Sequence, residues 1–70
     1  MGKRNNLISL RSKAKMTQSE LAGLIGVTER QYQNLEAGTS DGSIKVWQEL
    51  KRLLRAKSID WLLEQSDDKS

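Results

Sequence analysis

The stretch TQSELAGLIGVTERQYQNL, residues 17–35, reads as two short helices joined by a tight turn. Thr17 is followed three residues later by Glu20, and Thr28 is followed three residues later by Gln31. In this capping-box pattern the threonine hydroxyl accepts a hydrogen bond from one backbone N–H of the first helical turn, and the Glu or Gln side chain accepts another. Each threonine therefore marks the start of a helix.

The connection between these two helices is expected at Gly26. The two capping boxes stand 11 residues apart, which leaves about two turns of helix and a short turn. A helix that ends on a residue with positive φ favours glycine at that point. The small Ala22 permits a close crossing of the second helix, whose inward residues are Tyr32 and Leu35. This spacing describes a helix-turn-helix motif.

The sequence resembles the helix-turn-helix domains of phage repressors and Cro, the Xre-type regulators. The matching residues are TQSELAGLIGVTERQYQNLEAG at 17–38 and DWLL at 60–63, and the resemblance covers residues 7–63. It implies a fold of the all-α class: a compact, five-helix, lambda-repressor-like DNA-binding domain in which helices 2 and 3 form the motif. Tyr32 departs from the relatives, which usually carry Ile or Val there.

Apolar residues recur at helical spacing along the whole chain. We expect helices at about Asn6–Ala14, Gln18–Ile25, Glu29–Ala37, Ile44–Arg55 and Ile59–Gln65. The residues expected to face the core are Leu7, Leu10, Ala14, Leu21, Leu24, Ile25, Val27, Tyr32, Leu35, Ile44, Trp47, Leu50, Leu53, Leu54, Ile59, Leu62 and Leu63. Residues 1–70 are thus expected to form a single domain, with residues 1–5 as a flexible arm and residues 66–70 as a polar tail.

Composition excludes several kinds of protein. The 70 residues include no cysteine and no histidine, so a disulfide, a structural metal site or another cofactor is not expected. No apolar run approaches a membrane span, and the first residues lack an apolar signal core, which favours a cytoplasmic protein without membrane contact. A domain of this size has little room for a catalytic cleft, so it is expected not to be an enzyme.

The charge is unevenly distributed. Residues 1–57 carry 11 Lys/Arg and 5 Asp/Glu, whereas residues 58–70 have a net charge of −3. A basic body suits a polyanionic partner such as nucleic acid, and ordinary solvated charge is the alternative interpretation.

The outward face of the helix at Glu29–Ala37 carries Glu29, Arg30, Gln33 and Asn34, and no apolar residue. Amide and guanidinium groups make paired hydrogen bonds to base edges. The resemblance assigns base reading to Glu29, Arg30 and Asn34, and Gln33 is a further candidate for the same role. It assigns phosphate contacts to Gln18 and Thr28, to which we add the loop hydroxyls of Thr39 and Ser40.

Two further expectations follow from the resemblance. Relatives carry an ion pair at positions that match Arg11 and Glu36, which would tie the first helix to the third. A single domain covers about half of a DNA site, so a homodimer on an inverted repeat is expected. The residues expected at the dimer interface are Arg55, Ala56, Lys57, Ser58 and Trp61.

The expected partner is double-stranded operator DNA, without a small-molecule effector, because the chain leaves no room for an effector domain. It would act as a Cro-like transcription regulator, standing alone or as the N-terminal domain of a longer protein. An antitoxin or another protein-binding module can use the same fold, and a bare helical scaffold is the third interpretation. Salt-dependent binding to duplex DNA distinguishes these classes.

Overall fold

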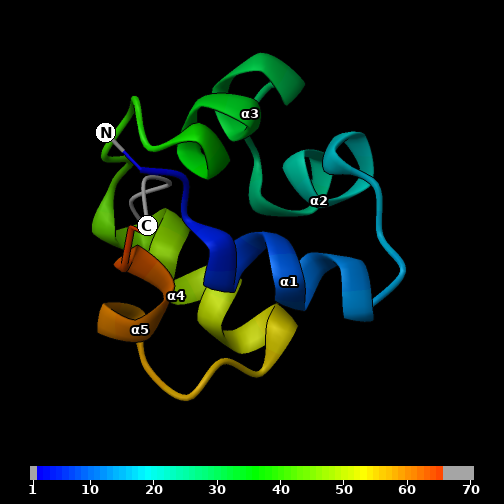
Figure 1. The fold of residues 1–70 in the computed structure, drawn as a ribbon. Helices are drawn as coiled ribbons and strands as arrows, with labels where there is room; N and C mark the ends of the chain where they lie inside the picture. The colour runs from blue at the N-terminus through cyan, green and yellow to red at the C-terminus, as the bar shows by residue number, and fades with distance from the viewer. Residues whose placement is uncertain (1, 66–70) are drawn as a thin grey trace.

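The computed structural model describes residues 2–65, which form five helices around one core (Figure 1). Met1 and the expected polar tail, residues 66–70, lie outside the described part. The helices are α1 Asn5–Lys13, α2 Gln18–Ile25, α3 Glu29–Ala37, α4 Ile44–Leu54 and α5 Ile59–Leu63. The all-α prediction is confirmed, and the bounds of α2 and α3 are those that the sequence predicts.

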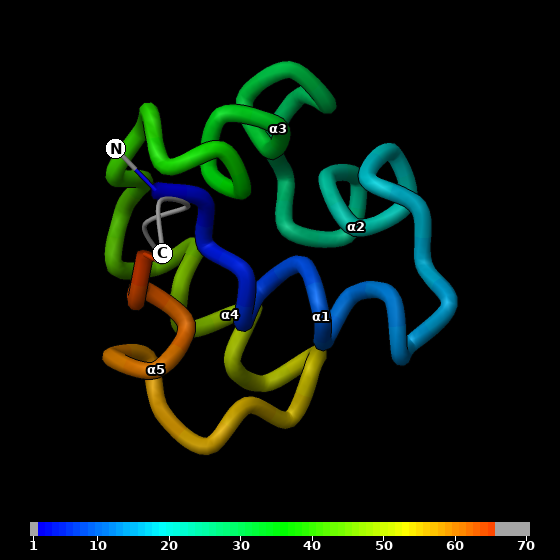
Figure 2. Tube along the Cα trace, viewed as in Figure 1, coloured from blue at the N-terminus to red at the C-terminus, as the bar shows by residue number. Residues whose placement is uncertain are grey.

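Both capping boxes are present at the helix-turn-helix. Thr17 Oγ1 accepts from the Glu20 N–H at 3.0 Å, and the Thr17 N–H donates to Glu20 Oε1 at 2.8 Å. The Thr28 pair repeats this geometry with Gln31, at 3.0 and 2.9 Å. Gly26 ends α2 with φ of 80°, so the connection to α3 begins at the predicted glycine. Figure 2 shows this turn between α2 and α3.

The last two helices end earlier than the sequence predicts. Arg55 was expected inside α4, but its φ of 57° places it in the left-handed region, where it ends the helix at Leu54. This conformation lets the Ala56 N–H donate to the Lys51 carbonyl at 3.0 Å. The helix α5 ends at Leu63 because the ψ of Glu64, 135°, lies outside the helical region.

The core is made of inward residues from all five helices. Its buried apolar members are Leu7, Leu21, Ala22, Tyr32, Leu35, Trp47, Leu50, Leu54, Ala56 and Leu62. Ala22 is 1% exposed, and α2 packs against α3. The helix α1 packs on α3 and α5, while α4 packs on α2 and α5.

Three expected core residues are exposed. Leu24 is 58% exposed because the inward arc of α2 is centred on Leu21, Ala22 and Ile25, and Leu24 lies about 100° around the helix from that centre. Ile44 is 63% exposed as the first residue of α4, in a turn whose flanking residues are exposed too. Ala14 is exposed because α1 ends before it.

The segment before α1 differs from the expected flexible arm. Arg4 is 4% exposed; its N–H donates to the Glu36 carbonyl at 2.9 Å, and its Nη1 donates to the carbonyls of Leu35 at 2.8 Å and Ser40 at 2.7 Å. Its guanidinium carbon lies 5.1 Å from the centre of the Trp47 ring. Carbonyls in the last turn of a helix have no partner within it. Arg4 supplies partners for two of them, which places this segment beside the loop after α3 (Figure 1).

Candidate nucleic-acid interface

The exposed face of α3 carries the four side chains that the sequence assigns to base reading. Glu29, Arg30 and Gln33 are exposed, and Asn34 is half-buried. Positions 29, 30, 33 and 34 lie on one side of an α-helix. The opposite side of α3 is fixed in the core by its buried residues Tyr32, Leu35 and Glu36. The structure therefore presents these four side chains together on a helix whose other side is packed in the core.

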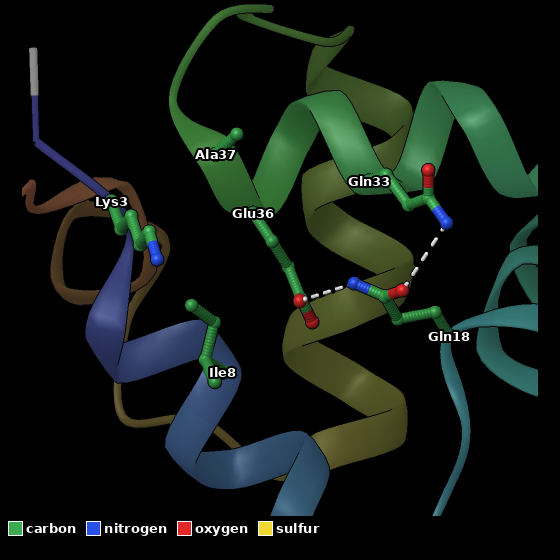
Figure 3. Close-up of a pocket in the computed structure, with 6 residues that line it drawn as sticks. All are labelled: Lys3, Ile8, Gln18, Gln33, Glu36 and Ala37. Carbon is green, nitrogen blue, oxygen red and sulfur yellow. Dashed lines mark hydrogen bonds between the residues drawn. The ribbon is translucent and has the colours of Figure 1, made fainter.

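Gln18, the predicted phosphate contact at the start of α2, is half-buried and already hydrogen-bonded. Its Nε2 donates to Glu36 Oε1 at 2.8 Å, and its Oε1 accepts from Gln33 Nε2 at 3.4 Å (Figure 3). The side chain thus connects the buried carboxylate of α3 to the exposed face of the same helix. One Nε2 hydrogen remains for an outside acceptor, because a primary amide has two donors.

The Glu36 carboxylate accepts hydrogen bonds from three helices. Arg11 Nε of α1 donates to Oε2 at 2.6 Å and the Tyr32 hydroxyl of α3 donates to the same oxygen at 2.6 Å, while Gln18 of α2 donates to Oε1. The structure thus brings Arg11 and Glu36 together, with side chains 17% and 6% exposed. The parts played by Gln18 and Tyr32 were not foreseen. The sequence signal for the Tyr32 contact is its spacing, because an inward-facing tyrosine one helical turn before Glu36 can reach that carboxylate.

The pKa shifts in this cluster keep both Tyr32 and Arg11 protonated. Burial, followed by the hydrogen bond to Glu36, raises the pKa of the Tyr32 hydroxyl well above its ordinary value. The hydrogen bond to Glu36 raises the pKa of the Arg11 guanidinium. The cluster therefore has a guanidinium and a neutral phenol to donate to one carboxylate.

Three hydroxyls complete the predicted phosphate contacts. Thr28 Oγ1 accepts from the Gln31 N–H, which leaves its O–H free to donate. Thr39 is exposed, and its Oγ1 donates weakly to the Asn34 carbonyl at 3.4 Å. Ser40 is half-buried, and its carbonyl is occupied by Arg4. Thr28 lies at the start of α3 and the other two follow its end.

Comparison with known families decides the identity of the fold. The family model described as helix-turn-helix matches residues 7–62, well over half of the chain. The chain belongs to the helix-turn-helix family. The predicted resemblance to Cro/C1-type, Xre-like members is confirmed. No curated protein and no solved structure gave a significant match.

As a helix-turn-helix protein, the chain is a DNA-binding regulator of a family whose members are generally not enzymes. In residues 2–65 of this helix-turn-helix domain, no group of His, Cys, Asp and Glu side chains is arranged to hold a metal ion. Over the same residues, each helix is too short or too polar to cross a membrane.

The predicted dimer surface of the helix-turn-helix domain lies around the loop between α4 and α5. Arg55 and Lys57 are exposed, and Trp61 is half-buried with the Lys57 amine 5.8 Å from the centre of its ring. Ala56 is 9% exposed, and Ser58 caps α5 by accepting from the Trp61 N–H at 3.0 Å. Ala56 and Ser58 therefore have structural roles within one chain, and the side chains available to a partner are the other three.

Proposed function

We propose that this helix-turn-helix protein is a sequence-specific transcription regulator that binds operator DNA with α3 in the major groove. The observation that carries the proposal is the exposed polar face of α3, with Glu29, Arg30, Gln33 and Asn34 on one side of a helix whose other side is fixed in the core. In this family's docking geometry the second helix of the motif reads base edges, while the first lies across the backbone.

The chemistry of the four side chains suggests a base preference for each. Arg30 matches guanine through paired bonds to O6 and N7, and Asn34 matches adenine through N6 and N7. The carboxylate of Glu29 accepts from the N4 amine of cytosine. A carboxylate that finds no such donor is repelled by the nearby phosphates, so Glu29 would also reject sites without cytosine at that position.

Contacts with the DNA backbone would set the position of α3 in the groove. Gln18 is suited to a phosphate oxygen because Glu36 and Gln33 hold its side chain in place while one amide hydrogen remains available. The hydroxyls of Thr28, Thr39 and Ser40 would contact phosphates at the two ends of α3. Such contacts fix register and orientation without reading sequence.

We further propose that the protein acts in the cytoplasm as a homodimer on an inverted repeat, with half-sites about 34 Å apart. Exposed Arg55 and Lys57, together with the half-buried Trp61, are the side chains offered to the second copy. Aromatic and arginine side chains are enriched at such interfaces. Sedimentation should show two copies on operator DNA, and a single copy both free and bound would contradict the dimer.

The deciding experiment is binding to duplex DNA over a range of salt concentrations, after selection of bound sequences from a random pool. A DNA-binding protein should lose affinity steeply as salt rises, because neutralised phosphates release their counterions. The selected sequences should share one motif that occurs twice in opposite orientation. Absence of duplex binding at low salt would reject the proposal in favour of a protein-binding role.

A further inference from the structure

A shallow hollow lies beside the predicted DNA-reading face, at the end of α3. Its volume is about 160 Å³, and it is bordered by the segment before α1, by α1, by the start of α2 and by α3. The lining residues are Lys3, Ile8, Gln18, Gln33, Glu36 and Ala37. Figure 3 shows Lys3 and Gln18 on opposite sides of this hollow, with Glu36 between them and Gln33 on the same side as Gln18.

Gln33 and Ala37 connect this hollow to the reading face. They are one helical turn apart on α3, both are exposed, and Gln33 is one of the predicted base-reading residues. A duplex that contacts Gln33 and Gln18 would therefore pass close to the mouth of the hollow. The DNA backbone is the part of the duplex that would lie at this edge.

The backbone of Lys3 is fixed on both sides. Arg4 is anchored by two hydrogen bonds to the end of α3 and by one to the loop carbonyl of Ser40, and the Gly2 carbonyl accepts from Gln65 Nε2 at 3.0 Å. The Lys3 carbonyl itself accepts from the Asn5 N–H at 3.0 Å. The exposed Lys3 side chain is thus tethered to an ordered part of the fold, which lowers the entropy lost when it binds.

The charge around the hollow favours an anion. The Glu36 carboxylate is 6% exposed and is paired with Arg11, so its negative charge is largely compensated. The remaining polar groups at the rim are the Lys3 amine and the side-chain amides of Gln18 and Gln33. Within residues 2–65, Lys3 forms no ion pair. One cation next to two amide donors matches the charge and the acceptor oxygens of a phosphodiester.

We propose that Lys3 contacts a phosphate of the DNA backbone next to the one reached by Gln18. The contact extends the protein–backbone interface along the segment before α1, and Arg4 is the residue that positions it. This inference rests on the proposed function, because it requires the duplex to lie against α3.

The test compares Lys3→Gln with Lys51→Gln, which removes the same charge from an exposed position on α4. Figure 1 shows the end of α4 on the far side of α1 from α3. Binding to the selected duplex and to a random duplex is measured as a function of salt. Lys3→Gln should reduce the slope of the logarithm of the binding constant against the logarithm of salt concentration by about 0.9. It should weaken binding to both duplexes by the same factor. Lys3→Arg should restore the slope.

The outcomes separate this inference from the proposed function. A slope for Lys3→Gln equal to that of the unmodified protein, or an equal reduction in Lys51→Gln, overturns the phosphate contact while leaving DNA binding intact. If Lys3→Gln weakens binding to the selected duplex only, Lys3 contacts a base rather than a phosphate, and the inference is also wrong. No salt-dependent binding by the unmodified protein overturns both proposals.

Discussion

The Tyr32 hydroxyl donates a hydrogen bond to Glu36 Oε2 across one turn of α3, at 2.6 Å, and both residues are buried. The same carboxylate oxygen accepts from Arg11 Nε at 2.6 Å. A buried carboxylate is costly unless its oxygens are hydrogen-bonded. The other carboxylate oxygen accepts from Gln18 Nε2, so the three donors come from α1, α2 and α3. Hydrogen bonding to one charge therefore also fixes how these three helices pack against each other.

Tyr32→Phe should destabilise the fold although the ring remains in the core. The change removes one donor from a buried carboxylate, and hydrogen bonds to charged groups contribute about 1.5–3 kcal/mol. The midpoint of denaturant unfolding should fall by the corresponding amount without a change in slope. An unchanged midpoint would show that the Tyr32 hydroxyl adds nothing to stability.

Stability should also fall at high pH because of Tyr32. The folded state raises the pKa of this hydroxyl, mainly through burial, whereas an unfolded tyrosine titrates near pH 10. The contribution is therefore fully present below about pH 10 and is lost as pH rises toward the folded pKa, by up to about 1.4 kcal/mol per pH unit.

Tyrosinate absorbance provides a direct readout, because Tyr32 is the only tyrosine in the sequence. It should appear together with loss of helical circular dichroism, not before it. Tyr32→Phe should show a shallower loss of stability above pH 10. Full tyrosinate absorbance near pH 10 in a protein that is still helical would contradict the raised pKa.

Glu36→Gln should lower stability by about 1.5–3 kcal/mol, because the half-buried Arg11 guanidinium loses the charged partner that Glu36 provides from the core. Glu49→Gln is the matched control: Glu49 pairs with Arg52 one turn along α4, but both side chains are substantially exposed. Surface pairs contribute about 0–1 kcal/mol, so this change should have a small effect. Equal melting temperatures for Glu36→Gln and the unmodified protein would reject a structural role for the Arg11–Glu36 pair.

The sequence predicts the local features of this fold well. Thr17 and Thr28 both cap the helices that they were expected to begin, and Gly26 has the expected left-handed backbone. These features depend on residues within three or four positions of each other. Spacing in the sequence is therefore sufficient to detect them.

What the sequence does not predict depends on contacts between distant residues. The Arg4 side chain binds carbonyls 31 and 36 residues away, and nothing in the first residues indicates this. The engagement of Gln18 by Glu36 is another such contact. Leu24 and Ile44 are predicted in the core because they are apolar and stand at helical spacing, whereas their exposure depends on which arc of each helix the neighbours cover.

Two glycines of the helix-turn-helix should respond oppositely to alanine. An added Cβ meets no atom within 4 Å at Gly23 or at Gly26, so backbone conformation alone decides the effect. Gly26 has φ of 80°, and Gly26→Ala should cost about 1–2 kcal/mol. Gly23 lies within α2, where Gly23→Ala should stabilise by about 0.5–1 kcal/mol. Thermal unfolding of both variants tests this, and shifts in the same direction would contradict it.

Arg30→Ala tests base reading by α3 most directly. Arg30 is exposed at the start of the helix and forms no ion pair within residues 2–65, so its removal should leave the fold intact. If the Arg30 side chain binds guanine, Arg30→Ala should weaken binding to the selected duplex by about 1–3 kcal/mol and relax the preference at one base position.

The control for Arg30 is Arg52→Ala, a change of the same charge on the exposed side of α4. Binding of both variants to the selected duplex, to single-base variants of it and to random DNA separates the two kinds of contact. A base contact predicts that the loss in Arg30→Ala is confined to sequences with the preferred base. If Arg30→Ala weakens binding to every duplex by the same factor, Arg30 instead contacts a phosphate, because contacts with the DNA backbone carry no sequence information. Reading of the site would then depend on Glu29, Gln33 and Asn34.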